Sequence, residues 1–170
     1  MTSGPNPAAA VVTTLRVLYL LLSVGVFVAD RLTKILIESG MMLHESRPVI
    51  PGFFQIVYAK NQGIAFGLFA ESTSGVKTFV LVFLSSLALA GVALLLWTAD
   101  HSATKLSAGL ALILGGALGN LFDRVQYGSV VDFLDFFVSG YHWPAFNLAY
   151  SAIVIGGGML LLHMTLGEKR

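Results

Sequence analysis

The chain has 170 residues, of which 56% are hydrophobic and only 11% are charged, against about 25% charged residues in an average soluble domain. This composition predicts an integral membrane protein of a single domain. The formal net charge of +1 gives no support to a nucleic-acid partner, and the absence of cysteine excludes disulfides, thiol nucleophiles and thiolate metal sites.

The first ten residues, MTSGPNPAAA, are small or contain proline and glycine, and they predict no fixed structure. The apolar run behind them is longer than a signal-peptide core and ends in charged residues without a cleavage site, so we expect a retained span. Four segments reach the length of about 20 residues that a helix needs to cross a bilayer. They are Thr14–Ile37, Val76–Trp97, Leu106–Arg124 and Phe146–Leu166.

The segment between the first two spans, RPVIPGFFQIVYAKNQGIAFGLF, contains short aromatic and β-branched runs that are broken by proline and glycine. This pattern is typical of strands and turns. It predicts a small β structure over Val49–Phe69. The expected fold is therefore an all-α membrane protein of four transmembrane helices, with a small β cradle on the outer, periplasmic surface.

Four spans place both chain termini on the same side of the membrane. Lysine and arginine separate the two sides only weakly. The predicted loop Val125–Pro144, however, contains neither residue, as is typical of an outside loop. We expect both termini in the cytoplasm and this loop outside.

Polar side chains gather at the outer ends of three predicted spans and in the loop between the last two. An ionisable group at membrane depth costs a few kcal/mol unless it is paired or hydrated, so this convergence predicts a functional polar cavity near the outer surface. An equal alternative is a simple interfacial ion pair for Asp30 with Lys34 and a helix-end charge pair for Asp123 with Arg124. The polar residues at this level are Asp30, Lys34, Asn120, Asp123, Arg124, Asp132 and Asn147.

Other chemistries have little support in the sequence. The four histidines are scattered without a His-Glu-x-x-His pair, so no metal site is expected. No serine stands beside a lysine or histidine in a nucleophile motif. A small transporter is disfavoured because the polar groups collect at one end of the spans instead of meeting at the bilayer midplane. Carboxylate chemistry remains.

Five motifs together resemble one family, the bacterial lipoprotein signal peptidases, also called signal peptidase II. They occur in the family's order and with its spacing. The motifs are DRLTK at Asp30–Lys34, NQGIAF at Asn61–Phe66, GGALGNLFDR at Gly115–Arg124, GSVVDF at Gly128–Phe133 and PAFNLAYSAI at Pro144–Ile153.

The resemblance implies an aspartic endopeptidase of the bacterial inner membrane that needs no cofactor. Its substrate would be a prolipoprotein with a diacylglyceryl-modified cysteine, which is cut just before that cysteine at the outer leaflet. Membrane lipid is the second implied partner, globomycin-like cyclic peptides are the implied inhibitors, and we expect a monomer.

In this family two aspartates share one proton and act together as acid and base. The first corresponds to Asp132, and the position of the second is occupied by Tyr150. A phenol holds its proton at neutral pH and serves poorly as a base, so we expect cleavage to be strongly impaired or absent. Asp135 and Asp123 are candidates to replace the missing carboxylate, and Asp135 would share a face with Asp132 only in a helical loop.

The other matched residues have binding or supporting roles by the same resemblance. Two functions therefore stay open: a signal peptidase crippled by Tyr150, and a non-cleaving protein that captures prolipoprotein or a peptide antibiotic on the same scaffold. The residues expected to bind substrate or support the site are Asp30, Lys34, Asn61, Gly63, Asn120, Asp123, Arg124 and Asn147.

Overall fold

A computed structural model describes residues 7–63, 74–99 and 104–166 of the chain. Within this part, four helices are long and apolar enough to cross a membrane, and a four-stranded antiparallel sheet accompanies them. The predicted fold class is confirmed. The helices are α1 (Pro7–Gly40), α2 (Ser74–Thr98), α3 (Thr104–Tyr127) and α4 (Leu148–Leu166).

All four helix starts differ from the sequence expectation, by two residues for α2, α3 and α4 and by seven for α1. Helix α1 begins at Pro7, inside the segment expected to lack structure. Proline is tolerated at the first helical position because the N–H that it lacks would have no partner within the helix. Helix α4 begins at Leu148 because Asn147 caps it, with its side-chain Oδ1 accepting the N–H of Tyr150 at 2.8 Å.

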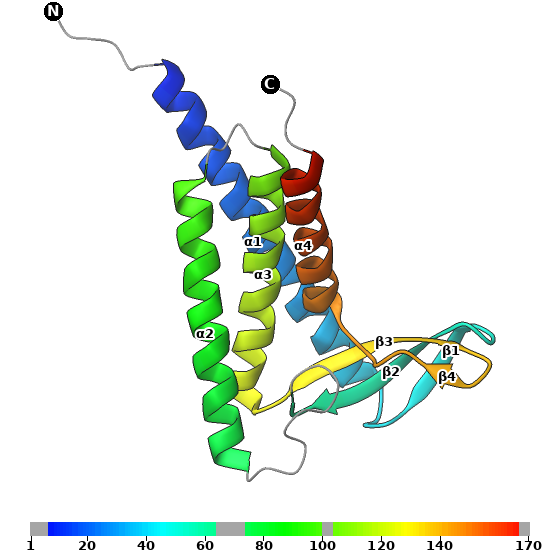
Figure 1. Ribbon diagram of the computed structural model, residues 1–170. Helices are drawn as coiled ribbons and strands as arrows, with labels where there is room; N and C mark the ends of the chain where they lie inside the picture. The colour runs from blue at the N-terminus through cyan, green and yellow to red at the C-terminus, as the bar shows by residue number, and fades with distance from the viewer. Residues whose placement is uncertain (1–6, 64–73, 100–103, 167–170) are drawn as a thin grey trace, which may run out of the picture.

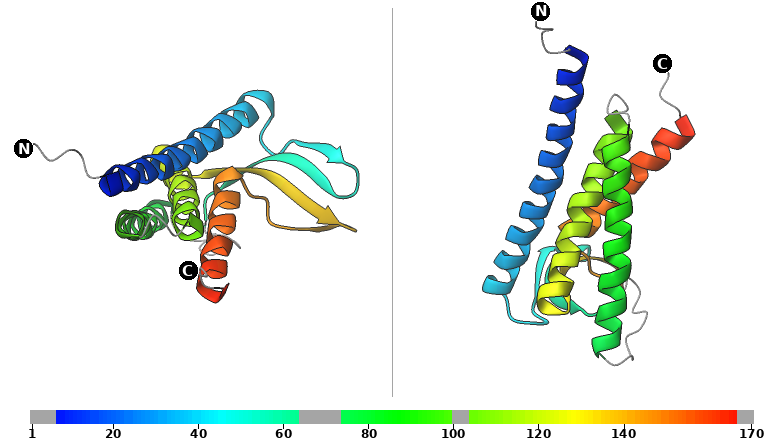
Figure 2. Two further views of the ribbon diagram at one scale, coloured as in Figure 1. Left: turned by 90° about the horizontal axis from the view of Figure 1, so that it is seen from above. Right: turned by 90° about the vertical axis from the view of Figure 1, so that its left-hand side faces the viewer.

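The four helices form a bundle in which α3 contacts each of the other three (Figure 1). The start of α1 and the end of α4 lie at one end of the bundle, and the sheet lies at the other (Figure 1). Viewed from above, the sheet projects sideways past the helices (Figure 2). The ends of the spans that carry the polar residues therefore lie next to the sheet, at the same end of the bundle.

Small residues let α3 approach its neighbours closely. A Cβ added to Gly116 would collide with the carbonyl oxygen of Ala149 in α4, and one added to Gly115 would collide with the carbonyl oxygen of Ser23 in α1. Gly156 faces α3 in the same way, whereas a Cβ added to Gly157 would meet nothing within 4 Å. Such contacts replace the hydrophobic driving force that is missing between helices in lipid.

The sheet has the order β1-β2-β3-β4. The strands are β1 (Ser46–Ile50), β2 (Phe54–Asn61), β3 (Val130–Val138) and β4 (Tyr141–His142). The expected β segment Val49–Phe69 thus contains the last two residues of β1 and all of β2, and its residues 64–69 lie outside the described part. The interpretation of Val125–Pro144 as a plain loop was wrong. Its sequence VVDFLDFFV is rich in β-branched and aromatic residues, and it forms β3 against β2.

Strand β3 guides the chain into α4. The backbone N–H groups of Phe133 and Leu134 both donate to the carbonyl oxygen of Phe146, and the Phe146 N–H donates back to the carbonyl of Leu134 at 3.0 Å. The Phe146 ring stacks on Phe136 with 5.9 Å between ring centroids. This pairing places Asn147 beside Asp132.

Gly116→Ala is expected to destabilise the protein by about 1 to 3 kcal/mol, because the new methyl group forces α3 and α4 apart. Gly91→Ala in α2 is the matched control, since a Cβ there meets nothing within 4 Å. The control should be neutral or slightly stabilising. Thermal unfolding in detergent micelles measures both, and equal unfolding temperatures would contradict the proposed packing.

Candidate functional site

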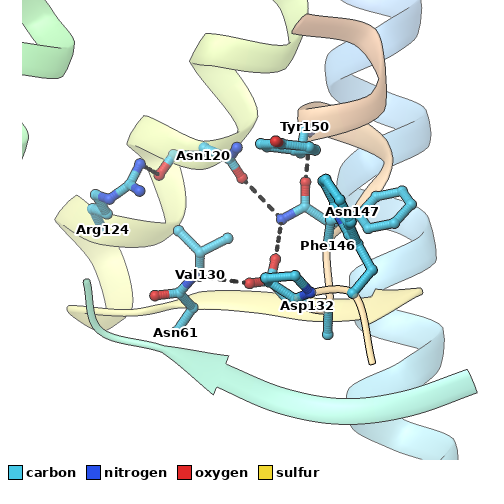
Figure 3. Close-up of a pocket in the computed structure, with 11 residues that line it drawn as sticks. Asn61, Asn120, Arg124, Val130, Asp132, Phe146, Asn147 and Tyr150 are labelled. Carbon is cyan, nitrogen blue, oxygen red and sulfur yellow. Dashed lines mark hydrogen bonds between the residues drawn. The ribbon is translucent and has the colours of Figure 1, made fainter. Parts of the chain in front are cut away.

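A pocket of about 80 Å³ lies where β3, α3 and the start of α4 meet (Figure 3). Its walls combine amide and charged side chains with aromatic rings. Six residues that the sequence singled out line it together, and they come from β2, α3, β3, α4 and the residue before α4. These are Asn61, Asn120, Arg124, Asp132, Asn147 and Tyr150.

Asp132 is the carboxylate of the pocket and is 6% exposed. Its Oδ1 accepts from Asn147 Nδ2 at 2.7 Å, and its Oδ2 accepts from Asn61 Nδ2 at 3.0 Å. Burial raises the pKa of Asp132 to about 6, against the smaller opposing effects of these two hydrogen bonds and of the charges on Lys34 and Arg124. The group is thus largely ionised at neutral pH and protonates in mild acid.

Asn147 connects Asp132 to two helices (Figure 3). Its Nδ2 also lies 3.1 Å from the carbonyl of Val131 and 3.2 Å from Asn120 Oδ1, while its Oδ1 caps α4. The side chain is 1% exposed. Both ends of the amide are therefore used, which fixes its orientation.

A fully buried ion cluster lies behind the pocket. Lys34 Nζ is 2.7 Å from Asp30 Oδ2, 2.7 Å from Asp123 Oδ2 and 3.1 Å from Asn120 Oδ1. Asp30 Oδ1 accepts the backbone N–H of Ala149 at 2.9 Å. The Asp30–Lys34 pair is internal instead of interfacial, because neither side chain has exposed surface. The alternative pair of Asp123 with Arg124 is not formed among the described residues, since Asp123 pairs with Lys34 and Arg31.

Arg31 is a site-supporting residue that the sequence reasoning missed. Its guanidinium forms an ion pair with Asp123 and lies 4.9 Å from the ring centroid of Phe122 and 5.5 Å from that of Tyr127. The sequence signal that could have identified Arg31 was its position inside the motif DRLTK. Its partner could not be read from the sequence because Asp123 lies 92 residues away on another helix.

The remaining predicted residues have distinct places. The Gly63 N–H donates to Asn61 Oδ1 at 2.9 Å and so orients that amide. Arg124 Nη1 donates to the carbonyl of Asn120 at 3.4 Å, and Arg124 Nε is buried without a hydrogen-bond partner among the described residues. The Tyr150 ring is tilted by 49° against Phe146, with 5.7 Å between centroids. Phe146 and Trp143 are further aromatic residues of the lining that the sequence did not single out.

Neither candidate replacement carboxylate reaches the pocket. Residues three apart on a strand point to opposite faces, and the Asp135 carboxylate accepts from Gln55 Nε2 at 2.7 Å and lies 2.8 Å from His142 Nδ1. Asp123 belongs to the ion cluster. Asp132 is consequently the one carboxylate among the described residues that line the pocket.

Comparison with known proteins identifies the family. The family model described as signal peptidase (SPase) II matches residues 22–166. The chain belongs to the signal peptidase II family. The lipoprotein signal peptidase of Solibacter usitatus is 46% identical over 139 residues, covering 82% of this chain and 85% of that protein. The lipoprotein signal peptidase of Desulforapulum autotrophicum is 46% identical over 147 residues, covering 85% and 89%.

The fold agrees with this assignment. A solved structure described as a bacterial membrane enzyme superposes with a TM-score of 0.75 at 30% identity, covering 89% of this chain and 92% of that one. The match to the signal peptidase II model includes all the residues that line the pocket. The chain is thus a multi-pass membrane protein of the signal peptidase II family.

Lys34→Met is expected to destabilise the protein by about 3 to 5 kcal/mol, because it leaves Asp30 buried without its cation. Lys60→Met is the matched control, since Lys60 is exposed and forms no salt bridge among the described residues. The free energy of unfolding, measured by titration with denaturing detergent in mixed micelles, should fall sharply only for Lys34→Met. Equal values would show that the ion cluster contributes little.

The pKa of Asp132, about 6, predicts a pH dependence of stability. The folded chain retains a proton that the unfolded chain releases from about pH 4 upward. This stabilisation is fully present below about pH 4 and is lost as the pH rises through 6. Its size is about 3 kcal/mol at most.

The variant Asp132→Asn removes this titration. Between pH 4 and 7.5 the free energy of unfolding of the unaltered chain should therefore fall more steeply than that of the variant. Asp135→Asn serves as the control on the same strand and should keep the steeper fall. Parallel pH profiles for Asp132→Asn and the unaltered chain would refute a raised pKa at Asp132.

Proposed function

We propose that this member of the signal peptidase II family binds diacylglyceryl-modified prolipoproteins but cleaves them very slowly or not at all. One observation carries the proposal: Asp132 is the one carboxylate among the described lining residues, and Tyr150 occupies the position at which the family resemblance implies the second aspartate. In this proposal the chain binds the family's substrate but has only one of the two catalytic aspartates.

The chemistry explains the expected loss. Two carboxylates a few ångströms apart cannot both ionise, so they share one proton, and one acts as base on a water while the other acts as acid. Asp132, with two amide donors on its oxygens, suits the base role above its pKa of about 6. The Tyr150 phenol can donate a hydrogen bond but cannot share a proton as a carboxylate does. Removing a positioned acid or base commonly costs about 10² to 10⁴ in rate.

The binding groups remain in place around Tyr150. Asn61 and Asn147 are each held by two or more hydrogen bonds, and Arg124 presents a buried donor without a partner among the described residues. These groups suit the backbone of an extended peptide, which offers both N–H and C=O. This observation favours the second candidate function, a binding protein that captures prolipoprotein or a globomycin-like cyclic peptide without cutting it.

The proposed setting is the bacterial inner membrane, with both termini in the cytoplasm and the pocket at the outer leaflet. Support comes from the position of the pocket at the sheet end of the bundle, opposite the start of α1 (Figure 1). Tyr141 in β4 and Trp143 directly after it are exposed, and aromatic residues of this kind are enriched at membrane interfaces. We propose that the protein acts as a monomer surrounded by membrane lipid. The proposed reaction uses only protein groups and water.

Tyr150→Asp is expected to raise the cleavage rate of a lipidated prolipoprotein by at least about 100-fold, because it restores the second carboxylate. Purified protein in detergent micelles is mixed with the lipidated substrate, and the release of signal peptide is followed over time. Tyr141→Asp makes the same change at an exposed position on β4 and should leave the rate unchanged.

Two results would overturn parts of this proposal. If the unaltered chain cleaves as fast as Tyr150→Asp, the missing carboxylate does not limit the reaction. If Tyr150→Asp binds the substrate and still does not cleave it, the pure binding protein is the better reading.

A further inference from the structure

The carboxylate of Asp132 has hydrogen-bond acceptor positions that no neighbouring donor fills among the described residues. An ionised carboxylate offers about four acceptor positions, and the described residues supply two neutral amide donors and no ion pair. Lys34 cannot fill the gap, because its Nζ already contacts Asp30, Asp123 and Asn120. A buried anion in this state is complementary to a cation that arrives with the ligand.

Three aromatic residues line the same pocket, and one of them stands where the family resemblance implies a second carboxylate. They are Trp143, Phe146 and Tyr150. A cation close to the face of an aromatic ring is attracted by the negative charge density of that face. The lining therefore combines the negative charge of Asp132 and the positive charge of Arg124 with three rings. A carboxylate beside aromatic rings is the chemistry that recognises ammonium groups.

Arg124 supplies the complementary half of the site. Its Nε is buried without a hydrogen-bond partner among the described residues. In Figure 3 Arg124 and Phe146 lie on opposite sides of the pocket, with Asp132 below and between them. A ligand with an ammonium group at Asp132 and the rings can thus direct a carbonyl oxygen towards Arg124. An ammonium followed closely by a carbonyl is the first residue of a peptide chain.

The size of the pocket agrees with such a ligand. A cavity of about 80 Å³ accepts a group of only a few heavy atoms. The amino end of a backbone fits this space, whereas a long cationic side chain such as that of arginine would have to displace the lining.

We propose that the Asp132 pocket binds the free amino terminus of a diacylglyceryl-cysteine peptide, the product side of the cleaved bond, in preference to the uncleaved amide. The inference rests on the proposed function, since it specifies which form of the lipidated chain the pocket retains. Hydrolysis of the amide adds water, leaving a carboxylate on the signal peptide and an amine on the cysteine that is protonated at neutral pH. The cysteine nitrogen is therefore a neutral amide before cleavage and a cationic ammonium group after it, at the position that we place next to Asp132.

The test compares two synthetic lipopeptides with the same diacylglyceryl-cysteine, one with a free amino terminus and one N-acetylated. Binding to the full chain in detergent micelles is measured at pH 7.5, where Asp132 is ionised. The free amine should bind at least about 10-fold more tightly, because acetylation removes one partner of a buried charge pair. Asp132→Asn should abolish this difference, and Asp135→Asn on the same strand should preserve it. Tyr150→Phe should also preserve it because the ring remains.

Equal affinity of the two lipopeptides for the unaltered chain would overturn the inference, whatever the variants do. A preference for the amine that survives in folded Asp132→Asn would overturn it too. A third peptide, the uncleaved lipidated precursor, separates this inference from the proposed function. If the precursor binds and the amine has no advantage over its acetylated form, only this inference fails. If none of the three peptides binds, both fail.

Discussion

The site depends on one buried contact set, in which Lys34 of α1 is held between Asp30 and Asp123. Lys34 also donates a hydrogen bond to Asn120, which lines the pocket. Asp30, on the same helix as Lys34, accepts the backbone N–H of Ala149 in α4. Asn120 in turn contacts the capping residue of α4, Asn147, which holds Asp132. The geometry of one carboxylate on a strand is thus set by charges on two helices.

Burying this cluster requires the neighbouring helices to make room. A Cβ at Gly119 would collide with the Asp30 carboxylate, so the glycine of α3 leaves the space through which α1 reaches α4. Charges taken out of water cost several kcal/mol each and are tolerated only with good geometry and further hydrogen bonds. Here Asp30 obtains both, from Lys34 and from the Ala149 N–H. The same close approach that packs helices in lipid also positions the polar site.

The sequence predicted what rests on local pattern. Four apolar runs gave the spans, and the depth of the polar residues indicated that they meet near one end. Strand β3 was missed although VVDFLDFFV carries a local strand signal. Its pairing with β2 had no such signal, because it joins residues about 70 apart, so that Asn61 and Asp132 meet only in the sheet. The partners of Arg31 and Asp135 were missed for the same reason, since contacts across helices and strands leave no periodic signal. Because the strand was not recognised, the sequence reasoning did not place Asp135 on the face of β3 opposite to Asp132.

The framework of the site does not depend on the side chain at position 150. Its backbone N–H bonds to Asn147 Oδ1, a contact that any residue except proline can make. The ion cluster, the cap of α4 and the amides on Asp132 use no side-chain atom of residue 150. Under the proposed function the Tyr150 ring stands in place of a carboxylate, so the pocket has one negative charge fewer and one more aromatic face, beside Phe146. On that proposal Asp132 lacks a proton-sharing partner, while the amides proposed to orient a peptide keep their hydrogen bonds.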